Sequence, residues 1–242
     1  MKGITLFSHS VRLVIDNLGD AFRLSIVPYI LIIAAQVHTF SIGRALQDAT
    51  DIDRLMSFSF VNLILSLASV VASLWIAVAW HRFVLLEEQN DGWVPPFNGR
   101  VMWGYFGWSL VIGILIALIA GGFALLVGTV IGPALGGILA AGIGAIIFFR
   151  LGLVLPAYAV GRKLSFSEAV NATKGETGTV LVLGFVAIVA NILISLPTLL
   201  SGNPFSPISL IFSLVLGWFA LIIGISLLTT LYGHFVEGRS VD

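Results

Sequence analysis

Acidic residues are the first candidates for chemistry in this sequence. They form two groups, Glu87, Glu88 and Asp91 in one polar segment and Asp48, Asp51 and Asp53 in another. Carboxylate oxygens are ligands for hard cations, but they bind weakly when no loop geometry fixes them. The four histidines are scattered and cysteine is absent, so these acids have no His pair, thiolate or phosphate-binding loop beside them. We therefore expect solvated loops, with no catalytic residue, no metal site and no cofactor.

Basic residues at the ends of apolar segments indicate a different chemistry, the binding of lipid phosphate. Arg82 and Arg150 each follow a long apolar segment directly and precede further apolar residues. A guanidinium placed there lies at the headgroup level, where it either holds a phosphate through two N–H groups or anchors the span by snorkelling. An internal carboxylate such as Glu87 or Glu168 would satisfy the same cations. The predicted anionic-lipid site comprises Arg82, Arg150, Arg162 and Lys163.

The composition indicates a membrane protein. Of the 242 residues, 58% are hydrophobic and 10% are charged, and the mean hydropathy is +1.07. Soluble domains carry about 25% charged residues, so this chain has too few charges to cover a soluble enzyme and is too apolar to be disordered. Its net charge of zero gives no reason to expect nucleic acid as a partner. We expect membrane lipids as partners, and leave open a membrane protein or a second copy of the chain.

Six segments are long and apolar enough to cross a bilayer as helices, which takes about 20 residues. They comprise residues 24–40, 57–80, 102–127, 131–155, 179–200 and 207–235. Residues 128–130 and the pair Gly132-Pro133 separate the third segment from the fourth, so we expect a tight hairpin there instead of one very long helix. The predicted fold class is all-α, a six-helix transmembrane bundle that forms one domain over residues 1–242.

The distribution of basic residues predicts the orientation of these spans. Ten of the twelve Lys and Arg residues lie on the same side of the predicted bundle as both termini. The other side has Arg44 and Arg54, diluted by three aspartates. Because short cytoplasmic loops carry the excess of Lys and Arg in membrane proteins, both termini are predicted to be cytoplasmic.

Two amphipathic segments are predicted to lie in the membrane interface. Within residues 1–20, positions 4–18 carry apolar side chains at intervals of three and four with polar ones opposite, which is typical of a helix lying flat on a bilayer. Residues 165–174 begin with a capping box of Ser165 and Glu168 and echo the sequence around Phe7. A third copy at 96–103 would make the chain three repeats of an interfacial helix and a hairpin, although short apolar matches also arise by chance.

Small residues recur at every fourth position across the third and fourth spans. This ladder consists of Gly128, Gly132, Gly136, Ala140 and Gly144. Small side chains at this spacing let helix backbones approach closely, which stabilises helix pairs in lipid. We therefore assign the ladder to helix packing.

Stripes of small and polar residues also run along three other spans. They pass through Ser66, Ser69 and Ser73, through Gly184, Ala187 and Asn191, and through Ser206, Ser209 and Ser213. Such hydroxyls usually hold helices together, but stripes that face one another around a cavity of several hundred Å³ would favour transport instead. No Asp or Glu lies within a predicted span, which weakens the case for ion-coupled transport.

Three sequence segments support a resemblance. With AWHRFVLLEE at 79–88, PPF at 95–97 and RLGLVLPA at 150–157, the chain resembles polytopic membrane proteins of alphaproteobacteria. More distantly it resembles the six-span membrane domain attached to some bacterial glycerophosphodiester phosphodiesterases, in which a separate soluble barrel carries the chemistry. The resemblance implies an inner-membrane location and a connection to lipid, and it carries over no catalytic residue.

These observations predict a multi-pass inner-membrane protein that is not an enzyme. We expect it to act as a structural, scaffold or lipid-interacting component. The alternative is a permease or translocator for a small molecule or a lipid.

Overall fold

The computed structural model describes residues 2–48, 52–90, 92–200, 202–203 and 205–241, and the regular secondary structure of this part is entirely helical. The elements that begin or make up the membrane-length segments are α2 (Leu18–Asp48), α3 (Ile52–Leu86), α4 (Gly99–Ile116), the π-helical turn η1 (Ala117–Gly121), α5 (Gly122–Ile131), α6 (Pro133–Leu151), α9 (Thr177–Leu200) and α10 (Pro207–Phe235). The other helices are α1 (Lys2–Asp16), α7 (Val154–Ala159) and α8 (Phe166–Ala172). The predicted all-α fold is confirmed.

Six helical segments of the described chain are long and apolar enough to cross a membrane, as predicted. The hairpin between the third and fourth is also confirmed, but its turn lies at Gly132 and not at residues 128–130, which stay helical. Gly132 has φ +92°, a backbone conformation that favours glycine. Pro133 follows at the first position of α6, where its fixed φ suits a helix start and its missing N–H costs nothing.

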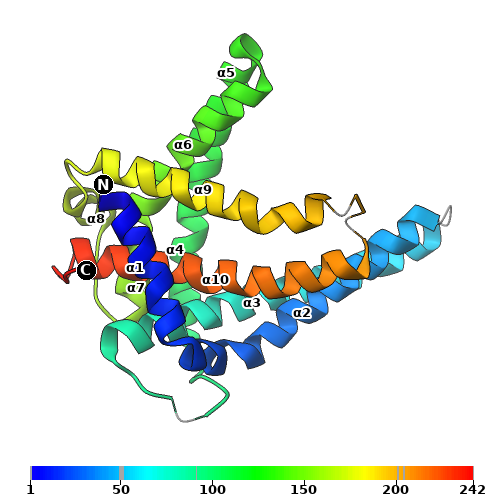
Figure 1. Ribbon diagram of the computed structural model, residues 1–242, viewed down its shortest axis with the longest axis horizontal. Coiled ribbons are helices and arrows are strands. Elements are labelled where there is room, and N and C mark those ends of the chain that lie inside the picture. The colour runs from blue at the N-terminus through cyan, green and yellow to red at the C-terminus, as the bar shows by residue number, and fades with distance from the viewer. Residues whose placement is uncertain (1, 49–51, 91, 201, 204, 242) are drawn as a thin grey trace.

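The spans form two limbs that diverge from one end of the molecule (Figure 1). The hairpin limb consists of α4, η1, α5 and α6, and its tip projects alone. The long limb consists of α2, α3, α9 and α10, which run together in another direction. We call the shared end, where α7, α8 and both termini lie, the basic end.

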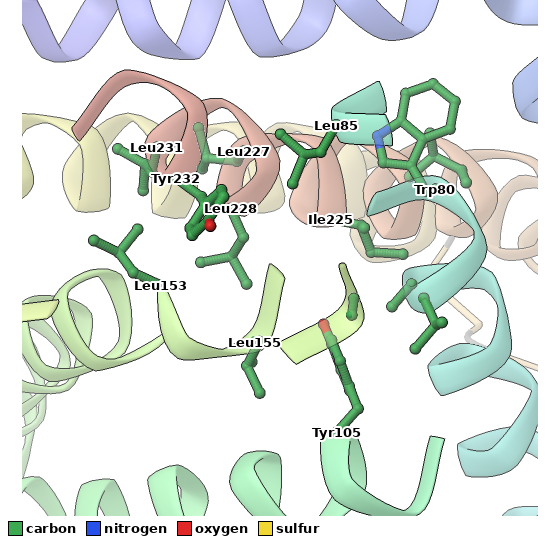
Figure 2. Packing of buried hydrophobic residues seen from close by; sticks show 14 of the residues in the cluster. Trp80, Leu85, Tyr105, Leu153, Leu155, Ile225, Leu227, Leu228, Leu231 and Tyr232 are labelled. Atoms are coloured by element: carbon green, nitrogen blue, oxygen red, sulfur yellow. The ribbon is translucent and has the colours of Figure 1, made fainter. Parts of the chain in front are cut away.

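The core lies at the basic end. Residues Ile225 to Gly233 of α10 are buried on every side of the helix, whereas the first half of α10 is largely exposed. Helix α7 packs inside this core, where Ala157 and the preceding N-cap residue Leu153 are fully buried. Figure 2 shows Leu153 on the side of Leu228 and Tyr232 of α10, whereas Leu155 extends from the opposite side of α7, and all four belong to the buried cluster. Exposed apolar side chains dominate the outer halves of both limbs, as expected of surfaces that face lipid.

Helix α1 corresponds to the predicted amphipathic helix, and its apolar side packs on α9 and α10. The contact is close because Gly3 lies against α9: a Cβ there would stand 2.7 Å from the Thr179 carbonyl oxygen. Lys2 Nζ also donates to Glu176 Oε1 at 2.6 Å. This bond, with help from the Thr179 hydroxyl, lowers the pKa of the Glu176 carboxyl. Charge and shape together fix α1 across the last two spans.

Helix α8 has the predicted capping box. The Ser165 hydroxyl accepts from the Glu168 N–H, and Glu168 Oε2 accepts from the Ser165 N–H at 2.7 Å. The bond from the Ser165 N–H, together with a second one that the Ser165 hydroxyl donates to Glu168 Oε2 at 2.7 Å, lowers the pKa of the Glu168 carboxyl. The predicted third copy is wrong as a separate helix, because α4 begins at Gly99 and continues unbroken into its span.

Candidate functional site

A groove of about 750 Å³ lies where the hairpin limb diverges from α9. Its walls come from η1 and its neighbours α4 and α5, from α6, and from α9. Small side chains line it, among them Ala120, Gly121, Ala141, Gly144 and Ala187. Larger residues at these positions would fill the angle between the helices, so the small residues keep the groove open. The site is apolar and suits a hydrocarbon chain.

Helices α6 and α9 touch at the narrow end of this groove. A Cβ added to Gly184 would lie 2.7 Å from the Ala145 Cβ, so α9 can approach α6 this closely only with glycine there. Farther from the basic end the two helices separate (Figure 1). The groove therefore widens along the hairpin limb, and its lining extends past the contact to Phe148 and Phe149, next to Arg150.

Arg150 lies just beyond this contact, in the last turn of α6. One of its terminal nitrogens donates to the Thr177 hydroxyl at 2.5 Å, while its Nε is buried without a hydrogen-bond partner. No carboxylate of the described chain forms an ion pair with Arg150. Its guanidinium therefore retains unused donors next to the groove.

The other predicted lipid-binding residues are placed differently. Arg82 pairs with Glu88 at 2.5 Å and also donates to the Ala159 carbonyl at 3.2 Å. Arg162 pairs with Glu237 at 2.9 Å. Lys163 is exposed between α7 and α8. Two of the four cations, Arg82 and Arg162, thus have internal carboxylate partners.

Glu88 reaches Arg82 because of how α3 ends. Glu87 has φ +55°, and a left-handed residue commonly ends a helix and reverses the chain. The Glu88 N–H then points back to the Arg82 carbonyl at 3.5 Å. The internal partner of Arg82 is therefore Glu88, one residue beyond the Glu87 considered from the sequence. Asp91 of the same acidic group and Asp51 of the other lie outside the described residues.

A second ionic network joins the C-terminal segment to α3. Glu237, whose side chain is 9% exposed, pairs with both Arg162 and Arg239. The Arg239 guanidinium also donates to the carbonyls of Val84 and Leu85 in the last turn of α3. Cations at a helix C-terminus are favourable because carbonyls there lack intrahelical partners. The network was not predicted from the sequence, since its members come from three separate segments.

The small-residue ladder divides between packing and turn. Gly136 packs on Gly128 within the hairpin, because a Cβ on Gly136 would lie 2.7 Å from the Gly128 Cα. Gly144 approaches Ile116 of α4, and Ala140 is buried between the same helices. Gly132 forms the turn and has no packing neighbour within 4 Å of a built Cβ. The ladder therefore positions the hairpin whose outer surface forms one wall of the groove.

A buried polar cluster lies between α3, α4 and α10, and the sequence analysis missed it. His81 Nδ1 lies 2.8 Å from the Thr229 Oγ1, and its Nε2 lies 3.1 Å from the Tyr105 hydroxyl. The Thr229 hydroxyl donates to the Ile225 carbonyl at 2.9 Å. All three side chains are at most 4% exposed. The available signal was a histidine inside an apolar span, where polar groups need partners.

Two of the three polar stripes converge in a pocket of about 400 Å³ at the end of the long limb away from the basic end. The polar side chains that line it are Gln36, Thr39, Ser66, Ser69, Ser209 and Ser213. Toward the basic end, α2 and α10 are bridged by hydrogen bonds from Tyr29 to the Leu214 carbonyl and from Trp218 to Ser25, both 2.7 Å. The stripe of α9 instead contributes Gly184 and Ala187 to the groove. The polar pocket is thus confined to one end of the limb.

Within the described residues, no three His, Asp or Glu side chains lie close enough to hold a metal ion. No known protein family, curated protein or solved structure matches this chain. The features of the described chain that could serve a function are the groove, Arg150 beside it and the polar pocket.

Proposed function

We propose that this multi-pass membrane protein is a non-enzymatic, lipid-interacting component of a bacterial inner membrane. The observation that supports this best is the apolar groove of about 750 Å³ between α6 and α9. Its volume is in the range of ligand sites, about 300–1,000 Å³. In a bilayer such a groove is filled by lipid chains or by another helix. The resemblance to membrane proteins of alphaproteobacteria supports the inner-membrane location.

We further propose that the basic end faces the cytoplasm. The excess of Lys and Arg at this end supports that orientation. The chain has no cysteine, so single cysteines can report the topology without background. Ser41→Cys, at an exposed position near the far end of α2, should react with an impermeant maleimide from outside the cell. Ser240→Cys should react only after the membrane is opened, and the reverse pattern would overturn the orientation.

The lipid role is tested with purified protein. Protein taken from bacterial membranes into mild detergent should retain phospholipid at a defined stoichiometry, detected by native mass spectrometry. In nanodiscs it should release no headgroup and no fatty acid. Retention of no lipid would overturn the lipid role, and turnover of a phospholipid would show that the protein is an enzyme.

The polar pocket favours a second candidate function, a permease or translocator. Serines of α3 and α10 face one another there together with Gln36 and Thr39. Transport through this limb would require the bridges made by Tyr29 and Trp218 to open. Protein reconstituted in liposomes should therefore show no solute or lipid flux above that of empty liposomes. Flux that increases in Trp218→Ala would favour the permease instead.

A further inference from the structure

We propose that the groove between α6 and α9 holds one anionic phospholipid, with its phosphate at Arg150 and Thr177 and an acyl chain along the groove. This inference rests on the proposed lipid role and adds the site and the headgroup class. Arg150 carries the charge, Thr177 carries a hydroxyl, and the two side chains already meet at 2.5 Å.

Charge is the first argument for an anionic occupant. The Arg150 guanidinium has no carboxylate partner in the described chain, whereas Arg82 and Arg162 both have one. Arginine offers five N–H donors in a planar fork that matches phosphate oxygens. One of them is bonded to Thr177, and the buried Nε is not bonded. A phosphate would give the remaining donors an acceptor of opposite charge.

The position of Thr177 connects this polar pair to the groove. Thr177 precedes Gly184 by seven residues and Ile188 by eleven, and residues at these spacings share one face of a helix. Gly184 and Ile188 both line the groove. The Arg150–Thr177 pair therefore lies on the same line as the groove, at its end nearest the basic residues.

The dimensions fit one leaflet. Arg150 lies in the last turn of α6, at the end of this helix away from the Gly132 turn. Ala141 of the groove lies nine residues from Arg150 along α6, which is roughly 13 Å at 1.5 Å per residue. One leaflet of a bilayer has about 15 Å of hydrocarbon. A lipid with its phosphate at Arg150 would thus lay its acyl chain along the groove wall formed by Ala141 and Gly144.

The π-helical turn adds a feature of the wall itself. Ala117, Ala120 and Gly121 of η1 all line the groove. π-Helices are rare, and single π-helical turns within α-helices occur frequently at functional sites. Here it turns small side chains of an otherwise α-helical span toward the groove.

The experiment measures lipid retention by native mass spectrometry after release from nanodiscs made of phosphatidylglycerol or of phosphatidylcholine with the same acyl chains. Wild type should retain one phosphatidylglycerol in preference to phosphatidylcholine. Arg150→Gln should weaken that retention about fivefold, the equivalent of one basic residue at an anionic surface. Arg100→Gln removes one exposed cation from the first turn of α4 and is the charge-matched control, which should retain lipid as wild type does.

A second pair of variants tests the groove without touching Arg150. Ala141→Phe places a ring in the groove, and Gly142→Phe places the same ring at the adjacent position, where a built Cβ meets nothing within 4 Å and which does not line the groove. Ala141→Phe should lose the retained lipid and Gly142→Phe should keep it. This pair decides the question if Arg150→Gln does not fold.

The outcomes separate the inference from the proposed function. Equal losses in Arg150→Gln and Arg100→Gln would show nonspecific surface attraction and overturn the site. Retention unchanged in both Arg150→Gln and Ala141→Phe would also overturn it, while leaving the lipid role intact. If wild type retains no lipid, the proposed function itself fails. A concentration-dependent dimer that Ala141→Phe disrupts, with no lipid retained, would show that a second copy of the chain fills the groove.

Discussion

Removing the Tyr105 hydroxyl should destabilise the junction of the two limbs. The hydrogens of the buried polar cluster can be assigned in sequence: Thr229 donates to the Ile225 carbonyl, so its oxygen accepts from the His81 Nδ1–H. His81 Nε2 then carries a lone pair and accepts from the Tyr105 hydroxyl at 3.1 Å. Tyr105→Phe leaves this lone pair without a donor. Because Tyr105 is 4% exposed and His81 is fully buried, water does not replace the hydroxyl.

The expected loss is about 1 kcal/mol of unfolding free energy. Leaving a buried polar group unsatisfied costs about 1–3 kcal/mol. Hydrogen bonds between helices of a membrane protein have averaged about 0.6 kcal/mol, with a maximum of about 1.7. The cluster is fully satisfied and dry, which places it in the upper half of that membrane range. Thr229→Val removes the acceptor of the Nδ1–H and should cost a similar amount.

Equilibrium unfolding in mixed detergent micelles, followed by circular dichroism, measures this loss. Tyr158→Phe is a matched control, because its hydroxyl rests against Gly104 of α4 without a hydrogen bond in the described chain, and it should be nearly neutral. Nitrogen-15 NMR of His81 should show the proton on Nδ1. A neutral Tyr105→Phe, or a proton found on Nε2 instead, would refute the assignment.

Three further perturbations test other contacts. Gly136→Ala should destabilise the hairpin by about 1–3 kcal/mol, because its Cβ would lie 2.7 Å from the Gly128 backbone. The control is Gly137→Ala, whose Cβ has open space and which should not lower the free energy of unfolding. Glu237→Gln should cost about 1–2 kcal/mol, since two charge-assisted bonds at a 9% exposed side chain are weakened; increased proteolysis of the C-terminal segment would show it. The Lys2–Glu176 pair should stabilise α1 docking above the usual carboxyl pKa, and this contribution, about 0.2–1 kcal/mol for an exposed pair, should disappear as the pH falls through the lowered pKa of Glu176. The pH dependence should become smaller in Lys2→Gln, where the Thr179 hydroxyl still bonds to Glu176, and a pH dependence as large as that of wild type would contradict the assignment.

The spans were predictable from the sequence because length and hydropathy decide whether a segment can cross a bilayer. The hairpin was predictable from Gly132-Pro133, since this pair ends one helix and starts the next. The arrangement of the limbs was not. In lipid the outer face of a helix is as apolar as its packed face, so the pattern along α6 or α9 does not indicate which side contacts a neighbour. Only the small-residue ladder around Gly136 predicted a helix contact, and that contact is the one between the two arms of the hairpin.

The candidate site was predictable in part. Arg150 was singled out because a cation between apolar segments needs a partner, and the structure places it beside a groove. Its neighbour Thr177 is 27 residues away on another helix, and no local pattern connects them. The sequence also left open whether Arg82 has an internal carboxylate, which depends on the left-handed turn at Glu87. Such pairings depend on how separate helices pack against each other, and no local sequence pattern predicts that packing.

The docking of α1 has a consequence for how the protein is made. Helix α1 is synthesised well before its partners, because Glu176 follows Lys2 by 174 residues. At about 5–20 residues per second, translation takes roughly 10–35 s to reach it. During this interval Leu6 and Val14, which end fully buried, have neither α9 nor α10 to cover them. The apolar side of α1 must therefore be held by the membrane surface or by a chaperone until α9 and α10 are made, so the docking of α1 on these two helices is a late step of assembly.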